Sequence, residues 1–264
     1  MSRIALILSY DGTSFNGWQT QAHRNGIQDH VERALRELTG EAMTVMCAGR
    51  TDTGVHASTQ VVHFDTQAER KLTAWTRGLN SMLPPGIASQ HALMVSTDFH
   101  ARFDAQKRRY HYFIYRAPMR QPILTQRAAW VFRPINVAKL AQASKSLIGE
   151  HDFTSFRSSE CQSKTPVRLM HSIEVQEIGS VVSVEFVANG FLHHMIRNLM
   201  GSLLYVAMGK QAPEWIDELL SVRDRKLAAP TFGAEGLYFT GVDYGAEHPL
   251  TELSWQAPAL PWHV

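Results

Sequence analysis

The chain of 264 residues contains only two cysteines, Cys47 and Cys161. Two are too few for a disulfide framework or a four-ligand zinc site, and we expect both thiols to be reduced, as in cytoplasmic proteins. No apolar run approaches the ~18 residues that a membrane span needs. Residues 1–10 lack a small-residue cleavage site and have the pattern of a first strand. The sequence therefore predicts a cytoplasmic protein with no membrane association.

A large excess of one charge is also absent, since 26 Lys and Arg residues are balanced by 24 Asp and Glu residues. The stretch between Asp104 and Glu150 is the exception, because it has no acidic residue. It contains nine basic residues: Lys107, Arg108, Arg109, Arg116, Arg120, Arg127, Arg133, Lys139 and Lys145. Basic and aromatic residues occur together within 108–116, and this mixture favours a nucleic-acid surface. A strand with a solvated basic edge is the structural alternative.

Apolar periodicity predicts strands and helices in both halves of the chain, an α+β fold around mostly antiparallel sheets. The predicted strands are 4–10, 43–48, 60–66, 87–95, 110–115, 169–177, 181–188 and 237–244. The predicted helices are 27–38, 74–82, 137–148, 191–208 and 213–222. We expect an N-terminal α+β domain at 1–105, a C-terminal α+β domain at 106–245 and an irregular tail at 246–264.

The segment 49–57, GRTDTGVHA, concentrates reactive groups on one short loop. Its two glycines allow the backbone to approach a ligand closely. It offers a carboxylate on Asp52, a guanidinium on Arg50 and an imidazole on His56. Taken alone, Asp52 either carries chemistry or caps the turn. A metal site at Asp52 and His56 is conceivable, but no further metal-binding motif accompanies them, and we expect no metal.

Several blocks of the chain match one family in the same order. The segment 47–56, CAGRTDTGVH, together with 60–64, QVVHF, closely resembles the catalytic motif of the tRNA pseudouridine synthase A (TruA) family. Five further segments resemble other motifs of that family: 10–19 (YDGTSFNGWQ), 98–103 (DFHARF), 108–112 (RRYHY), 151–156 (HDFTSF) and 191–198 (FLHHMIRN). Only the part after about Tyr244 lacks a clear counterpart.

The resemblance implies a tRNA-modifying isomerase. Such enzymes convert uridine to pseudouridine by breaking the C1′–N1 bond and forming a C1′–C5 bond, without cofactor or metal. The resemblance further implies action at positions 38, 39 and 40 of the anticodon stem-loop, a homodimer, and two related domains that flank a basic active-site cleft. Whether the carboxylate adds to C1′ or first removes the ribose 2′ proton stays open.

The resemblance also assigns roles to four residues. Asp52 is the catalytic carboxylate, and Arg197 is the basic partner that keeps it ionised in a water-poor pocket. Tyr110 lies against the target ring, and Arg50 fills the place that the flipped uridine vacates. The structural alternatives are an exposed helix arginine for Arg197, a core aromatic for Tyr110 and a phosphate-binding arginine for Arg50.

Other interpretations of the same residues remain. Cys47 adjoins the loop and a thiol nucleophile is chemically possible, but no base lies beside it in the sequence, which favours a packed cysteine. His193 and His194 more often satisfy local hydrogen bonds than act in catalysis. At the level of function, the rivals are a nucleic-acid binding module without chemistry and an N-glycosylase that lets water capture C1′.

Overall fold

The computed structural model describes residues 1–255, which form two compact units of mixed α/β structure with mostly antiparallel sheets. Unit 1 comprises residues 1–108 and the chain from Tyr238 onward, and unit 2 comprises residues 109–237. The coarse fold class that the sequence predicts is thereby confirmed. Each helix among the described residues is too short or too polar to cross a lipid bilayer.

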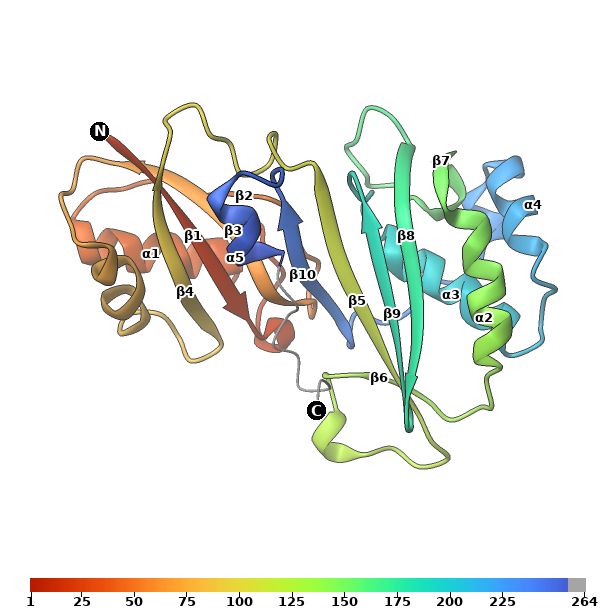
Figure 1. Ribbon diagram of the computed structural model, residues 1–264. Helices are drawn as coiled ribbons and strands as arrows, with labels where there is room; N and C mark the ends of the chain where they lie inside the picture. The colour runs from red at the N-terminus through yellow and green to blue at the C-terminus, as the bar shows by residue number, and fades with distance from the viewer. Residues whose placement is uncertain (256–264) are drawn as a thin grey trace. The chain divides into compact units, whose positions relative to one another are not determined.

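The sheet of unit 1 has the strand order β4-β1-β3-β10. Its strands are β1 (Ser2–Tyr10), β2 (Met46–Cys47), β3 (His56–Thr66), β4 (Ile87–Val95) and β10 (Leu237–Asp243). β1 pairs antiparallel with β3 and β4, whereas β10 pairs parallel with β3. Helix α1 (Ile27–Thr39) crosses one face of these strands (Figure 1).

Local sequence explains where the central elements of unit 1 begin and end. The apolar run Ile4–Leu8 is buried throughout, as expected for a strand with neighbours on both sides. In α1 the carboxylate of Asp29 accepts a hydrogen bond from the backbone N–H of Gly26 at 3.0 Å, which caps the start of the helix. The helix ends at Gly40, whose φ of 79° an L side chain rarely adopts.

The sheet of unit 2 has the order β5-β9-β8-β7, and β6 pairs with β5. Its strands are β5 (Lys107–Arg116), β6 (Ala129–Val131), β7 (Gly149–Asp152), β8 (Val167–Ile178) and β9 (Val181–Ala188). The helices α2 (Val137–Ser144), α3 (Met195–Ala207) and α4 (Trp215–Val222) lie together beside β8 (Figure 1). Helix α3 is the most buried of them, since it packs against both α2 and α4.

The structure differs from the predicted elements at several ends. The helix expected from 191 begins at Met195, because His194 has a φ of 60°. The helix expected at 74–82 contains a π-helical turn at Ala74–Gly78. The tail expected to be irregular contains helix α5 (Pro249–Ser254), where the His248 ring accepts a hydrogen bond from the Leu250 N–H. The rest of that tail, 256–264, lies outside the described residues.

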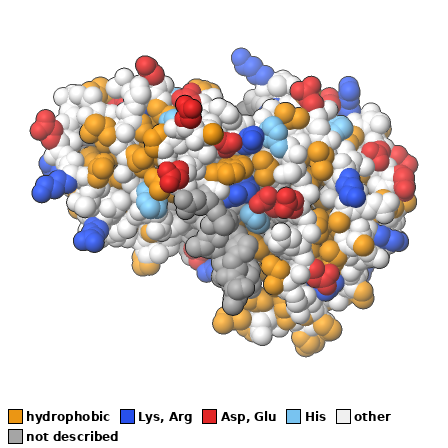
Figure 2. Space-filling view, in the orientation of Figure 1, with side chains coloured by type: hydrophobic (Ala, Val, Ile, Leu, Met, Phe, Trp, Pro, Cys, Tyr) orange, Lys and Arg blue, Asp and Glu red, His pale blue; other side chains and the backbone are white. Residues whose placement is uncertain are grey.

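The acid-free stretch after Asp104 is less basic in the fold than in the sequence. Arg109 is buried, and its Nε lies 3.8 Å from the carboxylate of Glu185 on β9. Arg116 forms an ion pair with Glu177 on β8. On the face shown in Figure 2, Lys and Arg side chains are interspersed with Asp and Glu. The structural alternative of a solvated basic edge therefore does not hold for Arg109, because other strands of the sheet supply acids that the local sequence lacks.

Candidate active site

The loop 49–57 connects β2 to β3 in unit 1 and presents two charged side chains. Its backbone turns at 52–55, where the carbonyl of Asp52 accepts a hydrogen bond from the N–H of Val55 at 3.1 Å. Gly54 has a φ of 80°, which the turn requires. Arg50 is exposed and Asp52 is half-buried, whereas Thr51 and Val55 are buried. The loop is thus anchored by its buried residues and offers Asp52 and Arg50 at its surface.

Buried polar side chains hold the start of this loop. The amide of Gln60 on β3 donates from Nε2 to the Gly49 carbonyl at 2.6 Å, and its Oε1 accepts from the Gly49 N–H at 3.4 Å. The same Nε2 donates to the hydroxyl of Tyr10 at 3.3 Å, and that hydroxyl shares a hydrogen bond with Thr51 Oγ1 at 2.8 Å. Burial raises the pKa of Tyr10 above its usual range, so the phenol stays neutral. This network holds the backbone of Gly49 and the side chain of Thr51, the residues on either side of Arg50.

Glycines bring the N-terminal block 10–19 into direct contact with the loop backbone. A Cβ at Gly12 would lie 2.0 Å from the Val55 carbonyl oxygen. At Gly17, where φ is 77°, a Cβ would lie 2.6 Å from the Thr51 carbonyl oxygen and 2.9 Å from the carbonyl carbon of Asp52. Beside it, the N–H of Trp18 donates to the Thr51 carbonyl at 2.9 Å. The block therefore supports the segment that carries Asp52.

His56 closes the other end of the loop. It is buried, and its Nδ1 lies 3.2 Å from both the Asp11 carboxylate and the Gly12 N–H. Its ring stacks on Tyr238 of β10, with a centroid separation of 4.6 Å. These contacts give His56 a structural role in joining β3, β10 and the N-terminal block.

The thiol beside the loop has the wrong protonation state for a nucleophile. Burial raises the pKa of Cys47 to about 12, although the charges of Arg50 and Arg102 act in the opposite direction. A thiol with that pKa is protonated at neutral pH, and the thiolate is the reactive form. The packed-cysteine interpretation is therefore favoured.

The other two predicted site residues belong to unit 2. Tyr110 on β5 is buried and packs edge to face against Phe191, with a centroid separation of 5.0 Å and an interplanar angle of 79°. Arg197 lies in the first turn of α3 and is half-buried. Its Nε donates to the Phe232 carbonyl at 2.9 Å, and its own carbonyl accepts from the Phe232 N–H at 3.1 Å. The direction of the Tyr110 ring is thus constrained by Phe191, and that of the Arg197 side chain by Phe232.

The segment that orients Arg197 is itself fixed to α3. The buried Asn198 accepts hydrogen bonds on Oδ1 from the Thr231 hydroxyl at 2.7 Å and from Arg225 at 3.0 Å. A Cβ at Gly201 would lie 2.3 Å from the Pro230 carbonyl oxygen, so only glycine allows this approach. These contacts hold the segment 230–231 against α3, next to the Phe232 carbonyl that accepts from Arg197.

Arg108, one of the nine basic residues in the stretch after Asp104, contacts backbone carbonyls of unit 1 and is half-buried. Its Nη1 donates to Ala105 at 2.8 Å, and its Nη2 donates to Ala48 at 3.3 Å and to Arg102 at 2.5 Å. Gln60 also supports the site, and its sequence signal is a glutamine in an apolar strand beside a glycine-rich loop.

Comparison with known proteins places these features in a family. The family profile described as tRNA pseudouridine synthase matches residues 6–104 and 143–245. The chain belongs to the tRNA pseudouridine synthase family. It is 50% identical over 262 residues to the tRNA pseudouridine synthase A of Bordetella petrii, covering 98% of both chains. Its identity to the protein of the same name from Janthinobacterium sp. is 48% over 260 residues, covering 96% of both chains.

Family membership confirms the resemblance drawn from the sequence blocks. A third relative, the tRNA pseudouridine synthase A of Paraburkholderia phytofirmans, is 48% identical over 264 residues. That alignment covers 100% of this chain and 97% of the relative. In this tRNA pseudouridine synthase, Asp52 and Arg50 share one loop of unit 1, while Tyr110 and Arg197 belong to unit 2. Their roles, and the approach of the two pairs to each other, stay predictions.

The glycine contact with the loop can be tested by two matched substitutions. Gly17 and Gly40 have nearly the same φ, 77° and 79°, but a Cβ at Gly40 meets nothing within 4 Å. Gly40→Ala should cost about 1 kcal/mol of stability from backbone strain and leave turnover intact. Gly17→Ala should cost at least ~3 kcal/mol and reduce turnover on tRNA, because the Cβ displaces Thr51 and Asp52. Equal effects of the two changes in thermal unfolding and turnover would contradict this role.

Proposed function

We propose that the chain converts uridine to pseudouridine at positions 38, 39 and 40 in the anticodon stem-loop of tRNA, as a cytoplasmic homodimer that needs neither metal nor cofactor. The reaction class follows from the family, whose members are isomerases that act on tRNA. The target positions, the dimer and the location follow from the resemblance of the sequence blocks. The single observation that carries the proposed mechanism is the carboxylate of Asp52 on a loop anchored at both ends.

The reaction needs one ionised carboxylate at the ribose of the target. The C1′–N1 bond breaks, the uracil turns while it is held, C5 bonds to C1′ and loses its proton to solvent, and N1 takes up a proton. A carboxylate either bonds to C1′ in the interval and leaves when C5 bonds there, or removes the 2′ proton, which is returned to C2′ in the product, and both routes use the same position. Because Gln60, Gly17 and Trp18 fix the loop backbone, Asp52 needs little rearrangement to reach that position.

Arg197 and Tyr110 complete the proposed site. A carboxylate in a water-poor pocket stays ionised only beside a cation, and Arg197 is the proposed cation. Its bond to the Phe232 carbonyl supports this role, since an oriented guanidinium pairs with a carboxylate at a lower entropy cost. The ring of Tyr110, held edge-on by Phe191, is suited to lie flat against the uracil while it is detached.

Arg50 is the proposed flipping residue. A uridine inside a stem must leave its stack before it can reach Asp52, which costs a few kcal/mol. Arg50 is exposed, lies two residues before Asp52, and is flanked by backbone that Gln60 and Tyr10 hold in place. An exposed guanidinium on a fixed backbone is suited to occupy the vacated position.

The role of Asp52 is tested by Asp52→Asn. This change should preserve the melting temperature and tRNA affinity but lower the rate of pseudouridine formation by on the order of 10⁴ or more, as when other enzymes lose a nucleophile. The measurement is position-specific mapping of pseudouridine in an unmodified tRNA transcript. Glu37→Gln removes an exposed carboxylate of α1 as a control and should leave the rate unchanged. A rate for Asp52→Asn within tenfold of the wild-type rate would contradict the proposed mechanism.

The role of Arg50 is tested by Arg50→Ala on two substrates. The rate on a paired stem uridine should fall, and the defect should shrink when the target is already unpaired, because less stacking and pairing energy must be overcome. The ratio of the two rates is therefore the quantity to measure. Arg70→Ala, which removes an exposed arginine elsewhere in unit 1, should leave that ratio unchanged. An equal loss on both substrates would assign Arg50 to general RNA binding or to the chemical step.

A further inference from the structure

Residues 100–103 expose an aromatic ring next to the loop that carries Asp52. We propose that Phe103, backed by His100 and Arg102 and here called the Phe103 platform, is a stacking site for an unpaired nucleobase of the RNA substrate. The proposal rests on the proposed function, because it assigns a contact of the same tRNA. It adds a binding site that none of the four predicted site residues provides.

The exposure of Phe103 is unusual for its residue type. Its side chain is 74% exposed, although Phe is normally a core residue. One side of the ring stacks on His100, with a centroid separation of 4.2 Å and an interplanar angle of 30°. The guanidinium of Arg102 lies 5.7 Å from the ring centroid. An aromatic ring that is supported on one side and exposed on the other can receive a second ring.

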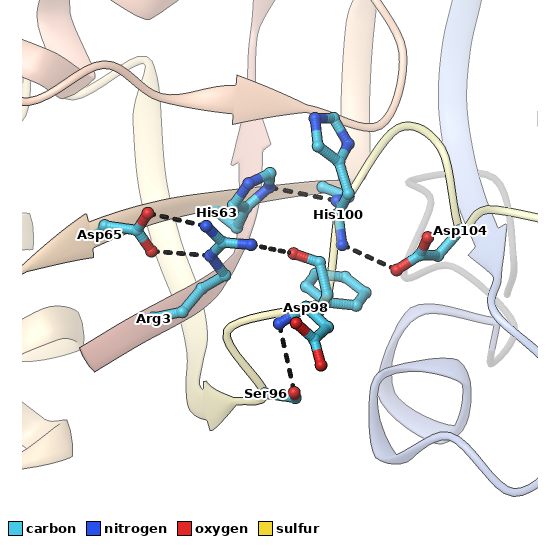
Figure 3. Close-up of polar contacts among 9 residues, drawn as sticks. Arg3, His63, Asp65, Ser96, Asp98, His100 and Asp104 are labelled. Carbon is cyan, nitrogen blue, oxygen red and sulfur yellow. Dashed lines mark hydrogen bonds and ion pairs between the residues drawn. The ribbon is translucent and has the colours of Figure 1, made fainter. Parts of the chain in front are cut away.

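The backbone around the platform is fixed by its own hydrogen bonds. The Nδ1 of His100 accepts from the N–H groups of Arg102 at 3.1 Å and Phe103 at 3.2 Å. The N–H of His100 donates to the carboxylate of Asp104 at 2.7 Å, and the N–H of Asp104 donates back to the His100 carbonyl at 3.1 Å (Figure 3). Phe103 is therefore held outward by a closed turn.

The turn is anchored to the sheet of unit 1. Arg3, which pairs with Asp65 through two hydrogen bonds of 2.7 Å, donates to the Phe99 carbonyl at 2.8 Å (Figure 3). The N–H of Ala101 donates to Nδ1 of the buried His63 at 3.1 Å, and burial lowers the pKa of His63 to about 4, so that it stays neutral. These contacts fix the platform to β1 and β3. Because its residues are already ordered, little conformational entropy is lost when a base binds.

Arg108 links the platform to the Asp52 loop. One nitrogen of its guanidinium donates both to the Arg102 carbonyl and to the carbonyl of Ala48, the residue before the loop 49–57. The side chains of Arg102 and Arg50 also act electrostatically on the same thiol, Cys47. An RNA that brings its target to Asp52 therefore passes within reach of the platform.

The chemistry of the platform favours a nucleobase over a protein partner. Unpaired bases stack on aromatic rings and on arginine planes, and both are present. Arg102 can in addition pair with a phosphate of the same nucleotide. Protein partners favour wide apolar patches, whereas Phe103 is a single apolar residue between two charged neighbours, Arg102 and Asp104.

The test is a set of substitutions at Phe103 in the full chain. Phe103→Ala should weaken binding of an unmodified tRNA transcript by roughly 5- to 100-fold, the loss expected for one stacked base. Phe103→Trp and Phe103→Tyr should bind like wild type, whereas Phe103→Leu should bind as weakly as the alanine variant because it lacks a π face. The rate at saturating tRNA and the melting temperature should change little. Met94→Ala truncates a similarly exposed apolar side chain on β4 and should leave tRNA binding, the rate and the melting temperature unchanged.

Several results would overturn the proposal. Binding of the alanine variant within twofold of wild type would exclude a stacking contact, as would full recovery with leucine. A loss confined to the rate at saturation would assign Phe103 to the chemical step. A changed sedimentation coefficient with unchanged tRNA affinity would assign the surface to a protein interface. Failure of the proposed function would give a different result: the wild-type chain would bind the tRNA but form no pseudouridine.

Discussion

The backbone of residues 12–18 lies directly against the backbone of the Asp52 loop, and the arrangement of the candidate site depends on this contact. It exists because Gly12 and Gly17 have no Cβ where one would collide with Val55, Thr51 and Asp52. Gln60 holds the same loop from β3. A loop backbone fixed in this way is in place before a substrate binds, so the proposed role of Asp52 does not require binding energy to order that backbone.

The sequence predicted the elements whose signals are local. The strands β4 and β9 and the helix α1 lie where their apolar periods place them, because each has a clear period and a turn or glycine at its end. Contacts between distant parts of the chain were not predictable in this way. The parallel pairing of β10 with β3, which puts Tyr238 under His56, depends on a connection through all of unit 2. The acids that pair with Arg109 and Arg116 were unpredictable for the same reason, because they lie on β9 and β8, far along the chain.

The sequence singles out the residues of the candidate site, but not the contacts that support them. Asp52 and Arg50 stand out because a glycine-rich loop with reactive groups is a local pattern that a family motif reinforces. The partners that orient Arg197 and Tyr110, Phe232 and Phe191, have no local signal, since they are apolar residues distant in the chain. The carbonyl acceptors of Arg108 were equally unpredictable, because they belong to the loops at Ala48, Arg102 and Ala105 and a basic run gives no signal for them.

The central claim is that this chain rearranges a uridine within the RNA and does not merely bind it or remove its base. The most direct measurement incubates the purified chain, without added metal or cofactor, with a tRNA transcript that carries tritium at C5 of its uridines. The account predicts release of tritium to water in step with pseudouridine formation and no free uracil. Free uracil among the products would indicate a hydrolytic glycosylase, and tight binding without tritium release would indicate a binding module. Either result would contradict the account.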